Sequence, residues 1–266
     1  LLSGLEHNPV TRPLEQIRKR IGIKIDSLNV VNNAGDFLNQ LQAKLKGSQY
    51  KLCVLTQASN VTGQILPVYE AATLCKNNEV ATLVDAAQVA GKMPVALSDS
   101  DISFWTASGH KGLLGPPGIG LLYVSPEFDL EPLITGGTGS ASEDIVPPLF
   151  YPDRLEPGTA PGTNIVGLKA GVEHLIQTDS EKTLQQELSL TQSFIDWTES
   201  FDQVKVFGPH ASFENNEPLR MPVVSFSLDG IAPGELASVL DCDYGIAVRP
   251  GLHCAALMHK NLGTIK

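Results

Sequence analysis

The stretch WTASGHKGLLGPPGIGLLYV, residues 105–124, places Lys111 in a turn of glycines and prolines between two apolar runs. These runs, ISFWTAS at 102–108 and GIGLLYV at 118–124, have the composition of buried strands. Glycine and proline make a turn stiff and let backbones approach closely. A charged, flexible side chain at such a place is either solvated or a chemical reagent, and the rest of the sequence has to decide between these two interpretations.

Two earlier apolar runs, KLCVLTQ at 51–57 and ATLVDAA at 81–87, flank a segment with apolar residues at helical spacing, LPVYEAATLCKNN at 66–78. A strand, a helix and a second strand of these lengths predict two parallel strands joined by a crossover helix. Surface helices are predicted at 8–22 and 34–47. The sequence therefore predicts an α/β fold around a largely parallel sheet.

Beyond about Pro161, long helical patterns dominate, at 164–177 and 182–201. A half-buried strand at 222–228, a helix with a glycine stop at 233–245 and a short strand at 246–251 are predicted to follow. We predict a large α/β domain over residues 1–165, connecting helices over 166–198 and a smaller α+β domain over 199–266.

Composition narrows the classes of function. With 42% hydrophobic and 18% charged residues, the 266-residue chain is typical of a folded globular protein. A net charge of −10 without a long basic run argues against nucleic acid or an anionic membrane as partner. No apolar stretch long enough for a membrane span and no secretory leader is visible. The four cysteines form no CxxC pair, which favours free thiols in the cytoplasm over zinc ligands.

Polar residues follow the predicted strands, at the sheet edge where open α/β proteins bind ligands. They are Asn60, Asp85, Gln88, Ser108, His110 and Lys111. A lysine and an aspartate at such an edge suggest pyridoxal 5'-phosphate, because the amine forms a Schiff base and the carboxylate pairs with the pyridinium nitrogen. Asp85 could also cap a following helix.

Five blocks of sequence resemble the class V aminotransferase-fold cysteine desulfurases, in order and over nearly the whole chain. They are SNVTGQILPV, LVDAAQVAG, TASGHKGLLGPPGIGLLYV, RLEPGTAPGTNIVGLKAG and GIAVRPGLHCAALMHKNLGT, beginning at residues 59, 83, 106, 154 and 245. The resemblance implies pyridoxal-phosphate fold type I, with an aspartate aminotransferase-like large domain, a smaller α+β C-terminal domain and a homodimer.

The resemblance also implies roles around the cofactor. Lys111 matches the Schiff-base lysine, Asp85 the partner of the pyridinium nitrogen, and Gln88 the hydrogen-bond donor to the ring oxygen. Asn60 matches the amide beside the substrate and the ring oxygen. His7, in GLEHNP, matches the histidine that stacks on the ring.

Further matches concern the phosphate. Ser108 and His110 match phosphate ligands, and Thr159 stands where the family's dimer sends a threonine to the phosphate of the partner subunit. The family normally continues beyond both ends of this sequence, and the preceding part includes a helix N-terminus that binds the phosphate. We therefore expect the 266 residues alone to hold the cofactor weakly or not at all.

The block RPGLHCA carries the R-x-G-x-H-C pattern of the SufS-like branch. The match makes Cys254 the nucleophile and Arg249 the residue that binds the substrate carboxylate. The implied reaction converts L-cysteine to L-alanine and leaves a persulfide on Cys254, from which a sulfur-acceptor protein would draw for iron–sulfur cluster assembly. His253 receives no role as a base, because adjacent side chains often point apart.

Alternatives stay open at this point. A related C–S or C–Se lyase or another class V enzyme would need no cysteine persulfide, and a non-catalytic remnant would keep only the fold. No metal site is predicted. The remaining cysteines, Cys53, Cys75 and Cys242, are expected to be structural. His174, His210 and His259 show no partner pattern in the sequence and are expected to be surface or core residues.

Overall fold

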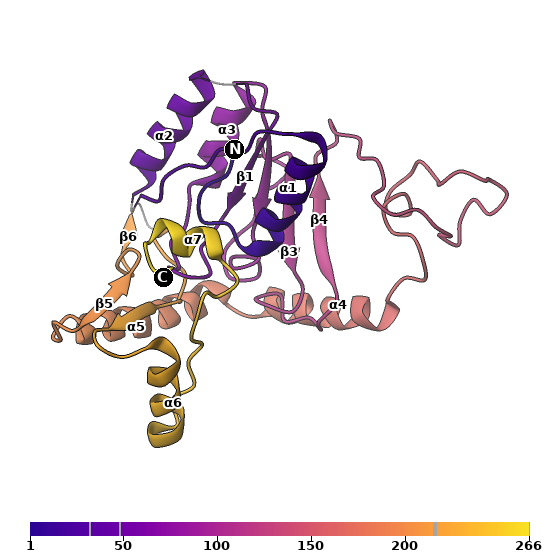
Figure 1. The fold of residues 1–266 in the computed structure, drawn as a ribbon. Helices are drawn as coiled ribbons and strands as arrows, with labels where there is room; N and C mark the ends of the chain where they lie inside the picture. Colours follow the sequence, from indigo (N-terminus) through magenta and orange to yellow (C-terminus); the bar gives the residue numbers. More distant parts are fainter. Residues whose placement is uncertain (32, 48, 215–216, 266) are drawn as a thin grey trace.

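A mixed four-stranded sheet forms the centre of the computed structural model, which describes residues 1–31, 33–47, 49–214 and 217–265 (Figure 1). The strands follow the order β1 (Leu52–Thr56), β2 (Ala81–Asp85), β3 (Phe104–Ser108) and β4 (Gly120–Val124). The first three are parallel, and β4 is antiparallel to β3. The four strands predicted between residues 51 and 124 are thus confirmed. The glycine- and proline-rich turn of residues 109–119 reverses the chain between β3 and β4.

Three helices accompany this sheet. They are α1 (Asn8–Ile21), α2 (Ala34–Gly47) and α3 (Val68–Lys76), close to the predicted ranges. Helix α3 connects β1 to β2 and packs against β2 and α2, as the strand–helix–strand pattern predicts. Helix α1 ends because Gly22 adopts a left-handed conformation, with φ of 74°, and donates its N–H to the Arg18 carbonyl.

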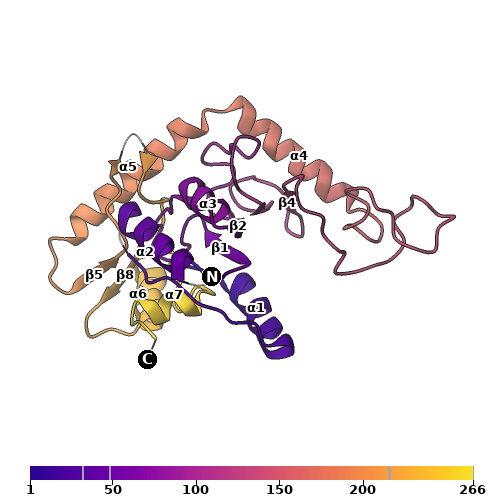
Figure 2. The same ribbon diagram turned by 90° about the horizontal axis from the view of Figure 1, so that it is seen from above.

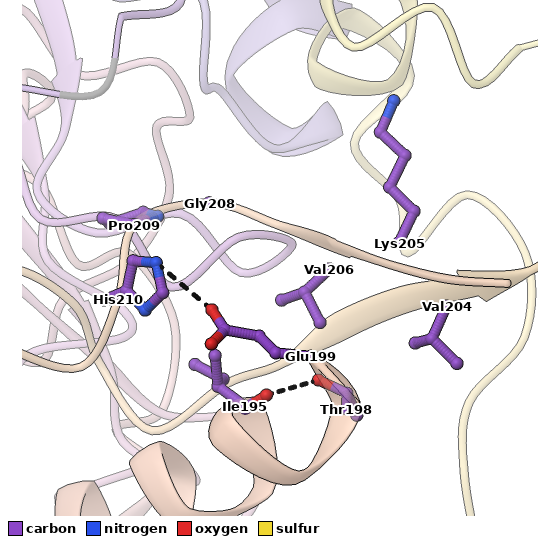
Figure 3. Close-up of a pocket in the computed structure, with 9 residues that line it drawn as sticks. All are labelled: Ile195, Thr198, Glu199, Val204, Lys205, Val206, Gly208, Pro209 and His210. Carbon is purple, nitrogen blue, oxygen red and sulfur yellow. Dashed lines mark hydrogen bonds and ion pairs between the residues drawn. The ribbon is translucent and has the colours of Figure 1, made fainter. Parts of the chain in front are cut away.

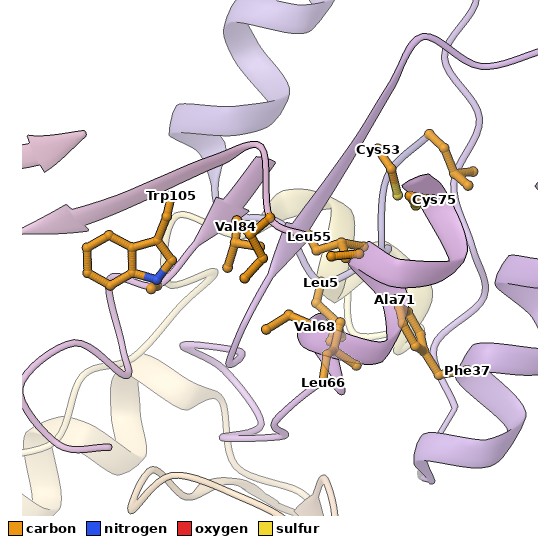
Figure 4. Close-up of a cluster of buried hydrophobic side chains, with 14 of the residues drawn as sticks. Leu5, Phe37, Cys53, Leu55, Leu66, Val68, Ala71, Cys75, Val84 and Trp105 are labelled. Carbon is orange, nitrogen blue, oxygen red and sulfur yellow. The ribbon is translucent and has the colours of Figure 1, made fainter. Parts of the chain in front are cut away.

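The main hydrophobic core lies between the sheet and helices α2 and α3, whereas α1 has no buried residue (Figure 4). Phe37 of α2 and Leu55 of β1 are buried in it, and burial of such side chains contributes about 1.5–3 kcal/mol each. Cys53 and Cys75 are also fully buried, with their thiols toward one another. The pKa of the Cys53 thiol lies well above its ordinary value because of its hydrogen bond with Cys75 and its burial, so this thiol is unreactive.

The C-terminal part begins with two long helices, α4 (Gly162–Gln177) and α5 (Ser180–Thr198), which run along one side of the molecule (Figure 2). Asp179 caps α5, since its side chain accepts a hydrogen bond of 3.0 Å from the Lys182 N–H. The remaining elements are β5 (Val204–Phe207), β6 (Phe213–Glu214), β7 (Glu217–Pro218), β8 (Ser225–Leu228), α6 (Pro233–Tyr244) and α7 (Ala256–Asn261). Strand β5 pairs with β8, and β6 with β7. The division into domains at residues 165 and 199 stays a prediction.

One predicted strand is wrong: residues 246–251 form no strand. Their backbone groups are engaged elsewhere, because the Ile246 N–H donates to the Leu240 carbonyl at 2.8 Å and the Arg249 carbonyl accepts from the His253 ring at 2.8 Å. Pro250 has no N–H to offer to a ladder. The structural role expected for Cys242 is also not supported, since this residue is exposed on α6.

The segment between β4 and α4, residues 125–161, contains neither helix nor strand and projects away from the sheet (Figures 1 and 2). It carries large apolar side chains that are exposed, among them Leu133, Ile145 and Leu149. Among the described residues, no helix combines the length and the apolar character needed to cross a membrane.

Candidate active site

The register of the parallel strands brings the predicted site residues to one edge of the sheet. Thr56 pairs with Asp85, and Asp85 pairs with Thr106, so the three strands end side by side. Just beyond these pairs the chain leaves the sheet in three segments, which carry Asn60 after β1, Gln88 after β2 and Lys111 after β3. Asn60 and Gln88 line one cavity of about 540 Å³ together with Arg249 and His253.

The turn that carries Lys111 packs backbone to backbone on the loop that follows Asp85. A Cβ atom added to Gly112 would lie 2.3 Å from the Ala90 carbonyl oxygen, and one added to Gly91 would lie 2.2 Å from the Gly112 oxygen. No larger residue fits at either place without a shift of the backbone. The glycines therefore fix the base of the half-buried Lys111 side chain close to the loop that begins at Asp85.

Asp85 ends β2 and is half-buried. One carboxylate oxygen accepts a hydrogen bond of 3.0 Å from the Ala87 N–H, a capping contact within a turn. No helix follows Asp85 in residues 86–92, so the alternative of a helix cap is wrong. A carboxylate offers about four acceptor sites on its two oxygens. The capping contact and a bond to a ring nitrogen are therefore compatible.

His7 lies immediately before α1 and within electrostatic reach of this edge. Its pKa is lowered, first by burial and then by the positive charges of Lys111, Arg249 and Arg12, while Asp85 acts in the opposite direction. The ring therefore favours its neutral form, and the charges of Lys111 and Arg249 lie near enough to His7 to act on it.

The segment leading to His7 is held by a buried carboxylate. Glu6 accepts hydrogen bonds from the backbone N–H groups of Ser3 at 2.8 Å and of Gly4 at 2.9 Å. Its pKa is raised, because burial disfavours the charged form. This local turn fixes the direction from which the chain enters the site.

The Cys254 turn, residues 249–255, is clamped to two other parts of the chain. The Asn8 N–H donates to the Cys254 carbonyl at 2.7 Å, and the Asn60 side chain donates to the His253 carbonyl at 2.8 Å. Asn60 and Cys254, predicted from separate motifs, thus lie in neighbouring segments, and His7 adjoins them through Asn8. The sequence analysis assigned no role to Asn8, for which the only signal was its place beside His7.

The Cys254 turn is strained and exposed. His253 and Cys254 both adopt left-handed backbone conformations, with φ of 50° and 56°, at a cost of about 1–2 kcal/mol each. Such strain persists only where surrounding contacts maintain it, and it clusters at functional sites. The Cys254 side chain is exposed, and the Arg249 Nη2 donates to its sulfur at 3.4 Å. This contact puts a positive charge beside the sulfur.

Both ring nitrogens of His253 point away from the thiol. Nε2 lies 2.8 Å from the Arg249 carbonyl oxygen, and Nδ1 lies 3.2 Å from Nε2 of His259. His259 is buried, and its Nδ1 lies 2.7 Å from the Thr264 hydroxyl. His259 is thus a core residue, within the predicted alternatives, and its contacts to His253 and Thr264 have no sequence pattern that could predict them. His253 has no free nitrogen to act as a base on Cys254.

The residues matched to the phosphate are less closely assembled. Ser108 ends β3 opposite Gly120 and is half-buried, and His110 is exposed one residue before Lys111. Thr159 is exposed at the end of the projecting segment, which Figure 2 shows away from the sheet edge. Ser108 and His110 lie near Lys111 in sequence, and among the described residues no hydrogen bond joins Thr159 to any of the three.

A second cavity, of about 320 Å³, lies between the end of α5 and β5 (Figure 3). His210 and Glu199 face each other there at 3.6 Å, and none of the predicted site residues lines it. Within the described residues, no group of three or more histidines, cysteines and carboxylates could hold a metal ion. The cavity lined by Asn60, Gln88 and Arg249 is therefore the stronger candidate, although Lys111, Asp85, His7 and Cys254 are not among its lining residues.

Comparison with known proteins agrees with this site. Residues 1–265 match the family described as Aminotransferase class-V. The chain belongs to the aminotransferase class-V family. The chain is 34% identical over 270 residues to a probable cysteine desulfurase of Pyrococcus abyssi, and the match covers 98% of this chain and 65% of that protein. It is 30% identical over 260 residues to a cysteine desulfurase of Escherichia coli O7:K1, covering 96% and 61%.

The solved structure of another protein has the same fold as this chain. The apo structure of a cysteine desulfurase from Thermococcus onnurineus matches with a TM-score of 0.82 at 33% identity, over 98% of this chain and 64% of that one. The predicted α/β fold of pyridoxal-phosphate fold type I is thereby confirmed. Enzymes of this family depend on pyridoxal phosphate. The chain spans 61% to 65% of the length of these three relatives.

Proposed function

We propose that the protein is a pyridoxal-phosphate-dependent cysteine desulfurase, which converts L-cysteine to L-alanine and moves the sulfur to Cys254. The observation that carries the proposal is the Cys254 turn. It presents an exposed thiol in a strained turn, with Arg249 at the sulfur and Asn60 and Asn8 holding the backbone at the edge where Lys111 stands. The names of the relatives support the same activity.

The residues at this edge fit the cofactor in their donor types. Half-buried Lys111 and Asp85 stand on adjacent loops that are locked together at Gly91 and Gly112. When bound, pyridoxal phosphate supplies an aldehyde for an amine and a ring that accepts negative charge from the substrate α-carbon. We assign Lys111 to the aldehyde, Asp85 to the ring nitrogen, Gln88 and Asn60 to the ring oxygen, His7 to the ring face, and Ser108 and His110 to the phosphate.

The chain's own residues would then divide the work. Arg249 binds the substrate carboxylate, since its planar guanidinium offers two parallel donors that a lysine lacks. The neutral amine of Lys111 takes the proton from the substrate α-carbon and holds it. The lowered pKa of His7 keeps its ring neutral, so that it adds no charge beside Lys111.

Cys254 acts on the sulfur. Its thiolate attacks the substrate sulfur, an S–S bond forms, and the C–S bond breaks with its electron pair passing to the β-carbon. The β-carbon takes up a proton, which balances the proton lost when the Cys254 thiol ionised, and Lys111 returns its proton to the α-carbon. The products are L-alanine and a Cys254 persulfide, so the balance needs no external oxidant. The thiolate is the reactive form, and the Arg249 donor at 3.4 Å stabilises negative charge on the sulfur.

Association and location are part of the same proposal. The exposed apolar side chains of the projecting segment, including Leu133, Ile145 and Leu149, suit a homodimer in which this segment reaches a second copy. Thr159, at the end of that segment, would then contact the phosphate of the partner site. We also predict that the enzyme is cytoplasmic and passes sulfur to an acceptor protein for iron–sulfur cluster assembly. We predict no nucleic-acid or membrane partner.

The test replaces Cys254 by alanine in the complete protein and measures alanine formation and protein-bound persulfide from L-cysteine. We expect sulfur transfer to fall by at least about a hundredfold, while the cofactor spectrum is unchanged. Cys242→Ala is the matched control, because Cys242 is also an exposed free cysteine. Sulfur transfer at the parent rate in Cys254→Ala would reject the proposal, and sulfide release without a persulfide would identify a lyase.

A further inference from the structure

We propose that His259 and Thr264 are positioning residues for Cys254, which act through a line of hydrogen bonds that runs from Thr264 through His259 and His253 to the Arg249 carbonyl. The inference rests on the proposed function only in taking Cys254 as the reacting thiol. The three contacts measure 2.7 Å, 3.2 Å and 2.8 Å and link the end of α7 to the start of the Cys254 turn.

The chemistry of the groups fixes the direction of this line. A carbonyl oxygen only accepts, so the Nε2 of His253 carries a hydrogen. In a neutral ring the Nδ1 of His253 then accepts, and the Nε2 of His259 donates to it. The Thr264 hydroxyl lies 2.7 Å from the remaining Nδ1 of His259 and 3.2 Å from the His259 carbonyl oxygen, and we take its single hydrogen to be donated over the shorter contact, to Nδ1. When both rings are neutral, a single arrangement of hydrogens satisfies all three contacts.

The His259 end of the line is anchored in the core, and the Arg249 end is not. Ala255 and Met258 are fully buried in the main hydrophobic cluster, and the His259 N–H donates to the Ala255 carbonyl at 3.0 Å. Arg249 and its neighbours from 244 to 252 are exposed. The burial that anchors His259 also lowers its pKa, with His253 acting in the same direction, which favours the neutral form of His259. The line thus transmits the rigidity of the core to an exposed loop.

Cys254 depends on this connection because it lies between the two ends. The left-handed conformations of His253 and Cys254 are maintained by their surroundings and not by local preference. If the Arg249 carbonyl is released, the turn can relax, and the Arg249 guanidinium can leave the sulfur that it contacts at 3.4 Å. The nucleophilicity of Cys254 would then fall even though neither histidine touches the thiol.

The experiment measures alkylation of Cys254 by iodoacetamide relative to Cys242, by mass spectrometry on the complete protein at one pH. Cys242 is exposed on α6 and serves as the internal standard, whereas Cys53 and Cys75 are buried. We expect the Cys254:Cys242 ratio to fall roughly 2- to 10-fold in His259→Leu, which is the range of one net hydrogen bond. His259→Gln keeps an N–H donor toward His253, and we expect its ratio within about twofold of the parent.

A second pair of variants covers the case in which His259→Leu does not fold. Thr264→Val removes the hydroxyl at nearly constant shape and should lower the ratio, whereas Thr264→Ser keeps the hydroxyl and should not. Equal ratios in Val and Ser, or a parent-like ratio in a folded His259→Leu, would overturn the inference and leave His259 a purely structural residue. The assay contains no L-cysteine, so a parent protein that mobilises no sulfur would reject the proposed function and leave this test standing.

Discussion

The turn that carries Lys111 and the turn that carries Cys254 solve the same problem, the presentation of one reactive side chain, in different ways. The Lys111 turn is held by contact between backbones, with Gly112 against the Ala90 carbonyl and Gly91 against Gly112. The Cys254 turn makes no comparable close approach at Gly251, where an added Cβ atom would meet no neighbour within 4 Å. Polar contacts from Asn8, Asn60 and His259 hold it instead.

The difference matches what each side chain is proposed to do. Lys111 would hold a cofactor through every cycle, and steric packing tolerates no alternative position. Cys254 would hand sulfur to a second protein, which requires an exposed thiol, and hydrogen bonds at a surface can be broken and remade. Close backbone packing thus holds the Lys111 turn in one position, and hydrogen bonds hold the Cys254 turn.

The largest expected effect separates the two reagents by function. Lys111→Ala should abolish both the attachment of pyridoxal phosphate and turnover of L-cysteine, the latter by at least about a hundredfold from loss of a proton-transferring group alone. Cys254→Ala should abolish sulfur transfer and retain the cofactor. Borohydride reduction of the cofactor-loaded complete protein, followed by peptide mapping, should place the pyridoxyl group on Lys111.

Lys92→Ala is the control for this prediction, since Lys92 stands on the loop that packs against Gly112 and pairs with Glu187. A pyridoxyl group on Lys92 or on any other lysine would contradict the assignment. So would a Cys254→Ala protein that had lost its cofactor, because the two turns would then not be independent.

The next effect concerns stability and compares two glycines. Gly112→Ala should lower the free energy of unfolding by about 1–3 kcal/mol or more, because its Cβ would overlap the Ala90 carbonyl. Gly251→Ala should cost about 1–2 kcal/mol, because its φ of 97° disfavours an L-residue although space is free. Denaturant unfolding of both variants measures the difference. If Gly251→Ala proved the more damaging, the Cys254 turn would be the more tightly packed of the two.

The sequence predicted an element correctly where the hydrogen-bond partners of its backbone lie in a neighbouring strand of the same sheet. Strands β1 to β4 were predictable, because apolar runs and a crossover helix specify neighbours within the same sheet. Residues 246–251 are as apolar as a strand, but their backbone groups bond to Leu240 and to the His253 ring. Apolar composition carries no information about such partners, so this prediction was wrong.

The candidate site shows the same limit. Asp85, Gln88 and Lys111 follow strands, and a sheet edge is a place that strand prediction can locate. Asn8 and His259 act through contacts made across the fold or around a turn, and no periodic spacing marks them. Thr159 stays an assignment by resemblance, since among the described residues no hydrogen bond joins it to the other site residues.

The smallest expected effect is a change in the titration of His7, which reports on the Lys111 turn without any chemistry. The pKa of His7 is lowered by burial first and by Lys111 second. Lys111→Gln removes only the second cause, so the pKa should rise part of the way toward its ordinary value. The histidine resonances of the complete protein, followed by NMR against pH without cofactor, measure this shift, and Lys92→Gln should leave it unchanged.

The lowered pKa also fixes the sign of a contribution to stability. Between the folded and the unfolded pKa of His7, the unfolded chain binds more protons than the folded chain, so stability rises with pH through that window. The contribution is complete above the unfolded value, about 6.5, and is lost as the pH falls through the folded value. Lys111→Gln should narrow this window from its lower end. A His7 that titrates alike in the parent and in Lys111→Gln would show that the lysine stands too far from the ring for the two to share one cofactor, and the assignment of His7 would fall while that of Lys111 remained open to the borohydride test.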